Sequence, residues 1–240
     1  MFDARKPVFD TTLARQIAKQ HLNNFNNVFW VAEHSYKEMR KSFAAIRFPT
    51  PGPGVHGHLP DQPSWQNGVD EFRVWTRQHV LISAASLLEV YVEGAATVAL
   101  SSQPRLVDRA ISSEGIEFLK HPERAPKHLE NIIKDRVSGF THGLWKDRIL
   151  NLSLVFGALP QSLLDMTPQL QSIQDRRNRI AHSYGLGGEL RRTPWQPIQA
   201  ITVSPSQISD AIKVVSAAIK IINDNIFLGA TGAYDLLEPV

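Results

Sequence analysis

Apolar residues recur at helical spacing over most of this 240-residue chain, and almost no stretch alternates between apolar and polar residues as a strand does. One run extends from residue 11 to about residue 45 without proline or glycine, and a second from about 67 to 100. Shorter runs cover residues 105–120, 126–139, 145–156, 167–185 and 206–227. The spacing predicts an all-α bundle of about six to seven helices, in a single domain over residues 1–240.

A proline-rich segment separates the two longest predicted helices. Residues 49–63 hold five prolines and three glycines, which end helices and favour turns. We therefore predict a loop there. The first helix is either continuous or bent near residues 23–27, where asparagines gather.

Composition narrows the class of protein. Hydrophobic residues make up 42% of the chain, enough for a buried core, and the absence of cysteine excludes disulfide scaffolds, thiolate zinc sites and cysteine nucleophiles. The net charge of +3 and the pI near 9.2 are compatible with anionic partners but identify none. The first residues do not resemble a secretory signal, so we expect a cytoplasmic protein.

One predicted helical stretch, residues 80–100, has roughly the length that crosses a bilayer. Glu89 and Glu93 lie near its middle, and each carboxylate would cost about 2 to 4 kcal/mol to insert. The alanines and serines of the stretch offset little of that cost. We therefore predict the buried helix of a soluble bundle, with no membrane contact.

Residues 177–184 place a cation where a helix should be apolar. At about 100° per residue, Arg177 falls near the centre of an apolar stripe on the helix predicted to begin at Thr167. A charged side chain on a packing face needs an anionic partner, which can be a carboxylate, a phosphate or a group across an interface. The stripe consists of Met166, Leu170, Ile173, Ile180, Ala181 and Tyr184.

Arg177, Asn178 and His182 together suit phosphodiester chemistry in RNA. Attack of a ribose 2′-hydroxyl on the adjacent phosphate needs a base that titrates near neutral pH, and histidine is the side chain that does so. The transition state also needs a permanent cation, which arginine supplies with bidentate geometry. This chemistry requires no metal or cofactor, and the chain has no clustered set of acidic or histidine ligands.

The pattern Arg-polar-x-x-Ala-His near the end of a bundle helix resembles the signature of the HEPN superfamily. In that signature an arginine and a histidine are separated by four to six residues, and here Arg177 and His182 are separated by four. Asn178 matches a common residue after the arginine. Upstream, Glu89 and Tyr91 resemble the acidic and aromatic residues of the family's earlier helix. The same Glu-x-Tyr pattern also resembles the RiboL-PSP-HEPN branch of the superfamily. The resemblance covers residues 67–185, with helices 11–45 and 206–227 as embellishments.

The resemblance implies a metal-independent endoribonuclease that acts as a toxin or as an antiphage, abortive-infection effector. It implies a homodimer that joins two motifs in one cleft, and cyclic phosphate ends on the cleaved RNA. Arg177 and His182 would be catalytic, supported by Asn178 and by Glu89, which would orient them. Tyr184 matches the tyrosine that a nucleotidyltransferase antitoxin modifies with AMP in some HEPN toxins, although its place on the apolar stripe favours packing.

Other interpretations remain open at this stage. Arg177, Asn178 and His182 could belong to an inactive HEPN-type module that binds nucleotide, RNA or a protein partner through the same residues. Alternatively, Arg177 could form a structural bridge to a carboxylate such as Glu89. Four further arginines form a basic collar that suits RNA contacts or a solvated surface. They are Arg176, Arg179, Arg191 and Arg192. The helical spacing of Trp65, Trp75 and Trp145 favours core packing over base stacking.

Overall fold

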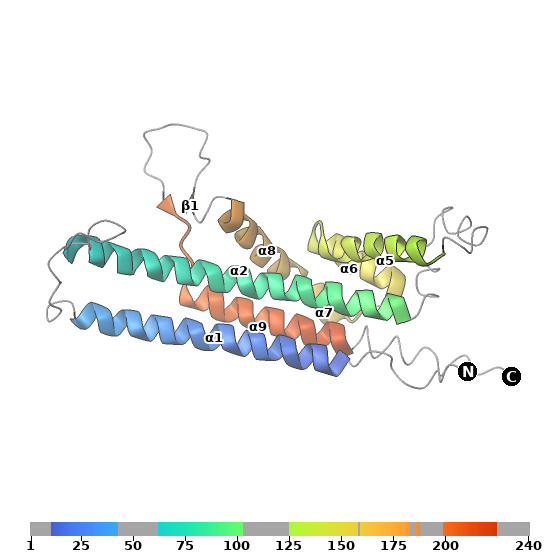
Figure 1. Ribbon diagram of the computed structural model, residues 1–240, viewed down its shortest axis with the longest axis horizontal. Helices are drawn as coiled ribbons and strands as arrows, with labels where there is room; N and C mark the ends of the chain where they lie inside the picture. The colour runs from blue at the N-terminus through green and yellow to red at the C-terminus, as the bar shows by residue number, and fades with distance from the viewer. Residues whose placement is uncertain are drawn as a thin grey trace, which may run out of the picture. The chain divides into compact units, whose positions relative to one another are not determined.

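The computed structural model describes residues 11–42, 62–102, 125–157, 159–182, 186–187 and 199–224. Within these ranges the chain forms seven helices and one two-stranded antiparallel ladder, β1 Leu186–Gly187 with β2 Gln199–Ala200 (Figure 1). The predicted all-α class is confirmed. The helices are α1 Thr11–Ser42, α2 Gln62–Ser102, α5 Ala125–Thr141, α6 Trp145–Phe156, α7 Gln161–Asp165, α8 Thr167–His182 and α9 Pro205–Ile222.

Most helix bounds follow the predicted runs, and the differences have local causes. Helix α1 is continuous, which settles the question of a bend near residues 23–27. Helix α2 begins at Gln62, about five residues earlier than predicted, because Pro63 in the first helical turn removes a donor that has no intrahelical acceptor. The predicted helix at 105–120 lies outside the described residues.

Helix α6 shows how spacing and turn residues fix an element. Its buried positions recur three and four residues apart, which makes one face of the helix. Asp147 in the first turn stabilises the positive end of the helix dipole. Gly143 before the helix and Gly157 after it have φ values of +86° and +94°, which other residues rarely adopt, so both turns require glycine. The buried residues are Trp145, Arg148, Ile149, Leu152 and Val155.

The described chain divides into two compact units. Unit 1 takes its residues from ranges 1–21, 85–174 and 213–240, and unit 2 from ranges 22–84 and 175–212. Four helices, α1, α2, α8 and α9, contribute residues to both units. The predicted single domain stays a prediction.

Unit 1 combines an apolar core with buried polar contacts. Arg15 of α1 donates to Asp224 beyond α9 at 3.0 Å, and the Tyr91 hydroxyl of α2 donates to Asn223 at 3.1 Å. Helix α6 is joined to α5 by a hydrogen bond from Asn151 to the Gly139 carbonyl at 2.9 Å. These contacts attach both α1 and α2 to the residues that follow α9, and α6 to α5.

In unit 2, Glu33 of α1 is a buried carboxylate between α1 and α2, and it is 5% exposed. It accepts hydrogen bonds from Arg73 at 3.1 Å and from Arg77 at 2.8 Å. Arg77 also donates to the Val203 carbonyl at 3.3 Å, and Gln78 to the Ile201 carbonyl at 2.9 Å, so α2 holds the segment that precedes α9.

Helix α2 is also the element that bears on membrane contact. Its stretch Gln66–Ser101 is long enough and apolar enough to cross a membrane, by length and composition alone. The core helix of a soluble protein can have the same length and composition. In the structure Leu88, Val92 and Ala96 of this stretch are at most 1% exposed. Cytoplasmic location stays a prediction.

The structure separates the predicted core tryptophans. Trp145 is 3% exposed, as predicted, whereas Trp75 is 52% exposed and the prediction that it packs in a core is wrong. Trp75 instead stacks on its neighbour Phe72, with ring centroids 5.9 Å apart. The side chain of Trp65 lies outside the described residues.

Candidate functional site

Helix α8 carries the Arg-x4-His motif on its last two turns. It begins at Thr167 with Pro168 next, as predicted, and ends at His182. Leu170 and Ile180 are 1% and 3% exposed and mark its packing face. Ala181 is exposed, so the apolar stripe is narrower than the sequence predicted.

Arg177 is half-buried on that packing face, seven residues after Leu170 and three before Ile180. Its Nη1 donates a hydrogen bond to the Oδ1 of Asn178 at 2.9 Å. Asn178 is also half-buried. The amide thus contacts a guanidinium that is partly withdrawn from water, and the predicted role of Asn178 in supporting catalysis stays a prediction.

His182 is the last residue of α8, and its side chain is exposed. It lies five positions after Arg177, which corresponds to about 7.5 Å along the helix axis and about 140° around it. The imidazole thus reaches solvent while the guanidinium lies at the edge of the packed face.

Glu89 has a partner that the sequence analysis did not name. In unit 1, Arg148 Nη1 donates to Glu89 Oε1 at 3.1 Å, and Arg148 Nε donates to the Gly143 carbonyl at 3.1 Å. The Arg148 guanidinium also lies 4.8 Å from the Trp145 ring centroid. Arg148 itself is 2% exposed. The predicted role of Glu89 in orienting Arg177 or His182 stays a prediction.

A signal in the sequence could have identified Arg148. It shares a helix face with Trp145, Ile149 and Leu152 at spacings of three and four residues. A cation on such a face needs an anion, which is the argument that drew attention to Arg177.

The predicted basic collar is only partly described. Arg176 is half-buried and Arg179 exposed, both on α8 beside Arg177. Arg191, Arg192 and Tyr184 lie outside the described residues. Within the described ranges, no three His, Asp or Glu side chains gather as a metal site would require.

Comparison of the chain with family models, with curated proteins and with solved structures finds no match.

Proposed function

We propose that this protein is a metal-independent endoribonuclease of the HEPN type, acting as a toxin or antiphage effector in the cytoplasm. In this proposal His182 takes the proton from a ribose 2′-hydroxyl, whose oxygen attacks the adjacent phosphorus. The bond from phosphorus to the 5′ oxygen breaks, and that oxygen keeps the electron pair and takes a proton from water. The products are a 2′,3′-cyclic phosphate and a 5′-hydroxyl end. Arg177 stabilises the negative charge of the transition state.

The observation that carries the proposal is the position of Arg177. A half-buried guanidinium held by a neutral amide is oriented and partly desolvated, and both properties strengthen its interaction with a phosphate. The exposed imidazole of His182 one turn further along is accessible to an RNA strand. Arg179, exposed on the same helix, adds a cation for the RNA backbone.

A second candidate function is an inactive module of the same kind that binds RNA, nucleotide or a protein partner. The exposure of His182 is compatible with it, because a binding surface needs no titrating base. The two candidates differ in whether RNA is cut. A homodimer that joins two motifs, and an antitoxin or nucleotidyltransferase that silences them, are further proposals that follow from the first.

The test is cleavage of total cellular RNA by the purified protein in excess EDTA, with fragment ends assayed for 2′,3′-cyclic phosphate. We expect cleavage by the wild-type protein and a loss of about 100-fold or more in His182→Ala, since general base catalysis contributes at least that much. His34→Ala is the matched control, because His34 is an exposed histidine on α1. RNA left intact by folded wild-type protein would favour the binding module, and equal cleavage by His182→Ala would refute the assigned base.

A further inference from the structure

Unit 2 carries an open apolar groove along the seam between α1 and α2. Its volume is about 740 Å³. The α1 side is formed by residues three, four and seven positions apart, so one stripe of that helix lines the groove over about three turns. The apolar residues that line it are Val28, Val31, Ala32, Tyr36 and Met39 of α1, and Val69 and Phe72 of α2.

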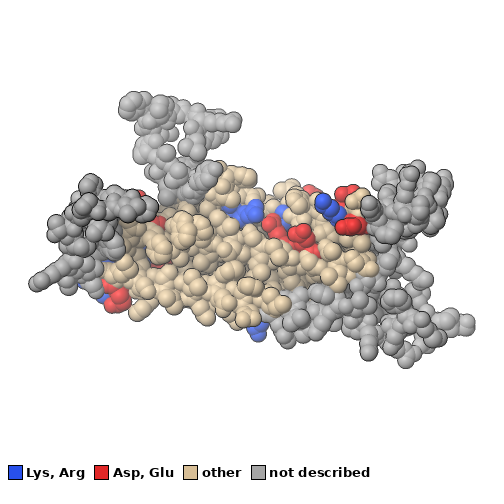
Figure 2. Space-filling view, viewed as in Figure 1, with Lys and Arg blue, Asp and Glu red and all other residues tan. Residues whose placement is uncertain are grey.

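Three of the side chains that line the groove are exposed to a degree that is unusual for large apolar residues. Val28, Val31 and Phe72 are 59%, 66% and 56% exposed, whereas Phe29 on the core face of α1 is 1% exposed. Helix α1 therefore has two apolar faces, one packed and one open. Contiguous exposed apolar surface marks an interaction site in soluble proteins. On the face drawn in Figure 2, most of the described surface carries no Lys, Arg, Asp or Glu side chain, so charged residues are sparse there.

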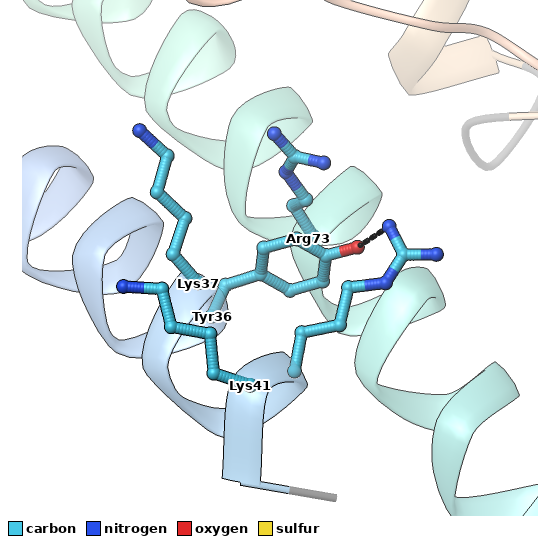
Figure 3. Close-up of a pocket in the computed structure, with 5 residues that line it drawn as sticks. Tyr36, Lys37, Lys41 and Arg73 are labelled. Atoms are coloured by element: carbon cyan, nitrogen blue, oxygen red, sulfur yellow. Dashed lines mark hydrogen bonds between the residues drawn. The ribbon is translucent and has the colours of Figure 1, made fainter.

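A basic pocket adjoins the groove at Tyr36, which lines both. Figure 3 shows Lys37, Tyr36 and Lys41 on α1 opposite Arg73 on α2, with the ammonium groups of Lys37 and Lys41 on one side of the phenol ring. The Arg73 guanidinium lies 4.2 Å from the ring centroid, and Arg40 donates to the Tyr36 hydroxyl at 3.2 Å. The pocket has a volume of about 390 Å³, and none of the described residues that line it is a carboxylate.

Three nearby carboxylates leave part of this positive charge uncompensated. Glu33 is shared by Arg73 and Arg77, Glu38 pairs with Lys41 at 2.7 Å, and Asp70 accepts from the Tyr36 hydroxyl. Among the described residues, these three carboxylates lie beside five cations, an excess of two positive charges. The cations are Lys37, Arg40, Lys41 and Arg73, which line the pocket, and Arg77, which shares Glu33. Lys37 has no ion pair with any described residue, so its ammonium is available to an external anion.

We propose that this groove is the docking site for an acidic amphipathic helix of a partner protein. Its apolar stripe packs against Val28, Val31 and Phe72, and carboxylates at one end bind Lys37 and its neighbours. From residue 28 to residue 39 the groove spans about 16 Å, the length of a helix of three turns. Tyr, Met, Phe and Arg, which line the groove and the pocket, are enriched at the centres of protein interfaces.

The charge distribution favours this occupant over a second copy of the chain. Among the described residues, no carboxylate lines the groove or the basic pocket, and Glu33, Glu38 and Asp70 beside them already accept hydrogen bonds or ion pairs from the same surface. A second copy seated by this surface would therefore bring as many excess cations as it meets. The surface is also separate in sequence from the α8 motif, so the proposal does not depend on ribonuclease activity.

The probe is a fluorescein-labelled synthetic helix of 18 residues, with leucines at spacings of three and four and glutamates beside them. Two control peptides replace the glutamates with lysines or scramble the leucine positions. We expect fluorescence anisotropy to report binding of the acidic peptide at least about tenfold tighter than of either control, and weaker at high salt. Equal or absent binding of the acidic peptide would overturn the proposal.

Two variants locate the binding site. Val31→Asp places a charge in the groove and should weaken binding of the acidic peptide by at least about tenfold. Val90→Asp, at a 63% exposed valine of α2 outside the groove, should leave the binding affinity unchanged. Lys37→Glu should weaken it by about fivefold, against Lys19→Glu as control. Circular dichroism confirms that each variant is folded.

Self-association abolished by Val31→Asp would assign the groove to a second copy, and binding only to phosphatidylglycerol vesicles would assign it to a membrane. Either result would overturn the proposal.

Discussion

Arg148 and Arg177 both lie on the packing faces of their helices, yet their surroundings differ. Arg148 is 2% exposed and contacts the Glu89 carboxylate, the Gly143 carbonyl and the Trp145 ring. Arg177 is half-buried, and the neutral amide of Asn178 accepts its hydrogen bond. The contacts of Arg148 join α2, the turn at Gly143 and α6 within unit 1. For Arg177, the proposed function predicts a different role, which is to bind the scissile phosphate.

Breaking the buried ion pair should have the largest effect on stability. In Arg148→Ala, Glu89 would lose its partner inside unit 1, and we expect the free energy of unfolding to fall by about 3 kcal/mol. Urea denaturation followed by circular dichroism measures the change. Lys146→Ala, at an exposed cation on the same helix, is the control and should change stability by less than about 0.5 kcal/mol. A loss below about 1 kcal/mol in Arg148→Ala would remove the contrast with Arg177.

Glu33 in unit 2 is a second carboxylate whose arginine partners stabilise the fold. Burial raises its pKa, but hydrogen bonds and charge from Arg77 and Arg73 outweigh burial and hold the pKa below its ordinary value. We expect Glu33→Gln to lower the free energy of unfolding by about 2 kcal/mol at pH 7.

The pH dependence of this effect has a definite sign. Because the pKa of Glu33 is lower in the folded state, its contribution is complete above the unfolded carboxyl pKa of about 4.3 and is lost as the pH falls through the folded value. Urea titrations between pH 3.5 and 7 should therefore show the difference between wild type and Glu33→Gln shrinking at the acid end. A difference independent of pH would show that the ionised carboxylate contributes nothing.

Tyr91 and Asn223 form a buried hydrogen-bonded pair. As with Arg177 and Asn178, the acceptor is the amide oxygen of an asparagine. Their side chains are 6% and 2% exposed, and we expect Tyr91→Phe to cost about 1 kcal/mol at pH 7. Burial raises the pKa of Tyr91, so the folded state retains the proton while an unfolded tyrosine ionises near pH 10. The wild-type protein should lose stability relative to Tyr91→Phe above about pH 10, measured by urea denaturation across that range. Parallel profiles would contradict the predicted linkage.

Asn178 should affect activity more than stability. Asn178→Ala removes the acceptor of the Arg177 hydrogen bond, but alanine also favours the helix, so we expect the free energy of unfolding to change by less than about 0.5 kcal/mol. If the bond orients Arg177 for catalysis, the RNA cleavage rate should fall by about fivefold. An unchanged rate would mean that the amide has no part in the reaction.

The sequence predicts the helices well because apolar spacing is a local property. The run at 145–156 coincides with α6, and the start of α8 follows from Thr167 and Pro168. Helix α7, Gln161–Asp165, is too short to show a period and was not predicted. The spacing also cannot reveal whether an apolar stripe is covered, since that depends on neighbouring elements, and α1 carries one packed and one exposed stripe.

For the site, sequence reasoning located the arginine but not the pairing of charges. The half-burial of Arg177 follows from its position between Leu170 and Ile180 on one helix face. The contact of Glu89 with Arg148 joins residues 59 positions apart, so only the tertiary fold brings them together. The same is true of Glu33 with Arg73 and Arg77, which lie 40 and 44 positions away.

The most direct test of the contrast between the two arginines is the RNA cleavage rate of Arg177→Ala in EDTA, at a temperature where circular dichroism shows it to be folded. We predict a loss of at least about 100-fold, with a free energy of unfolding within about 1 kcal/mol of wild type. Undiminished cleavage, or a free energy of unfolding lowered by about 3 kcal/mol as expected for Arg148→Ala, would contradict the catalytic assignment of Arg177.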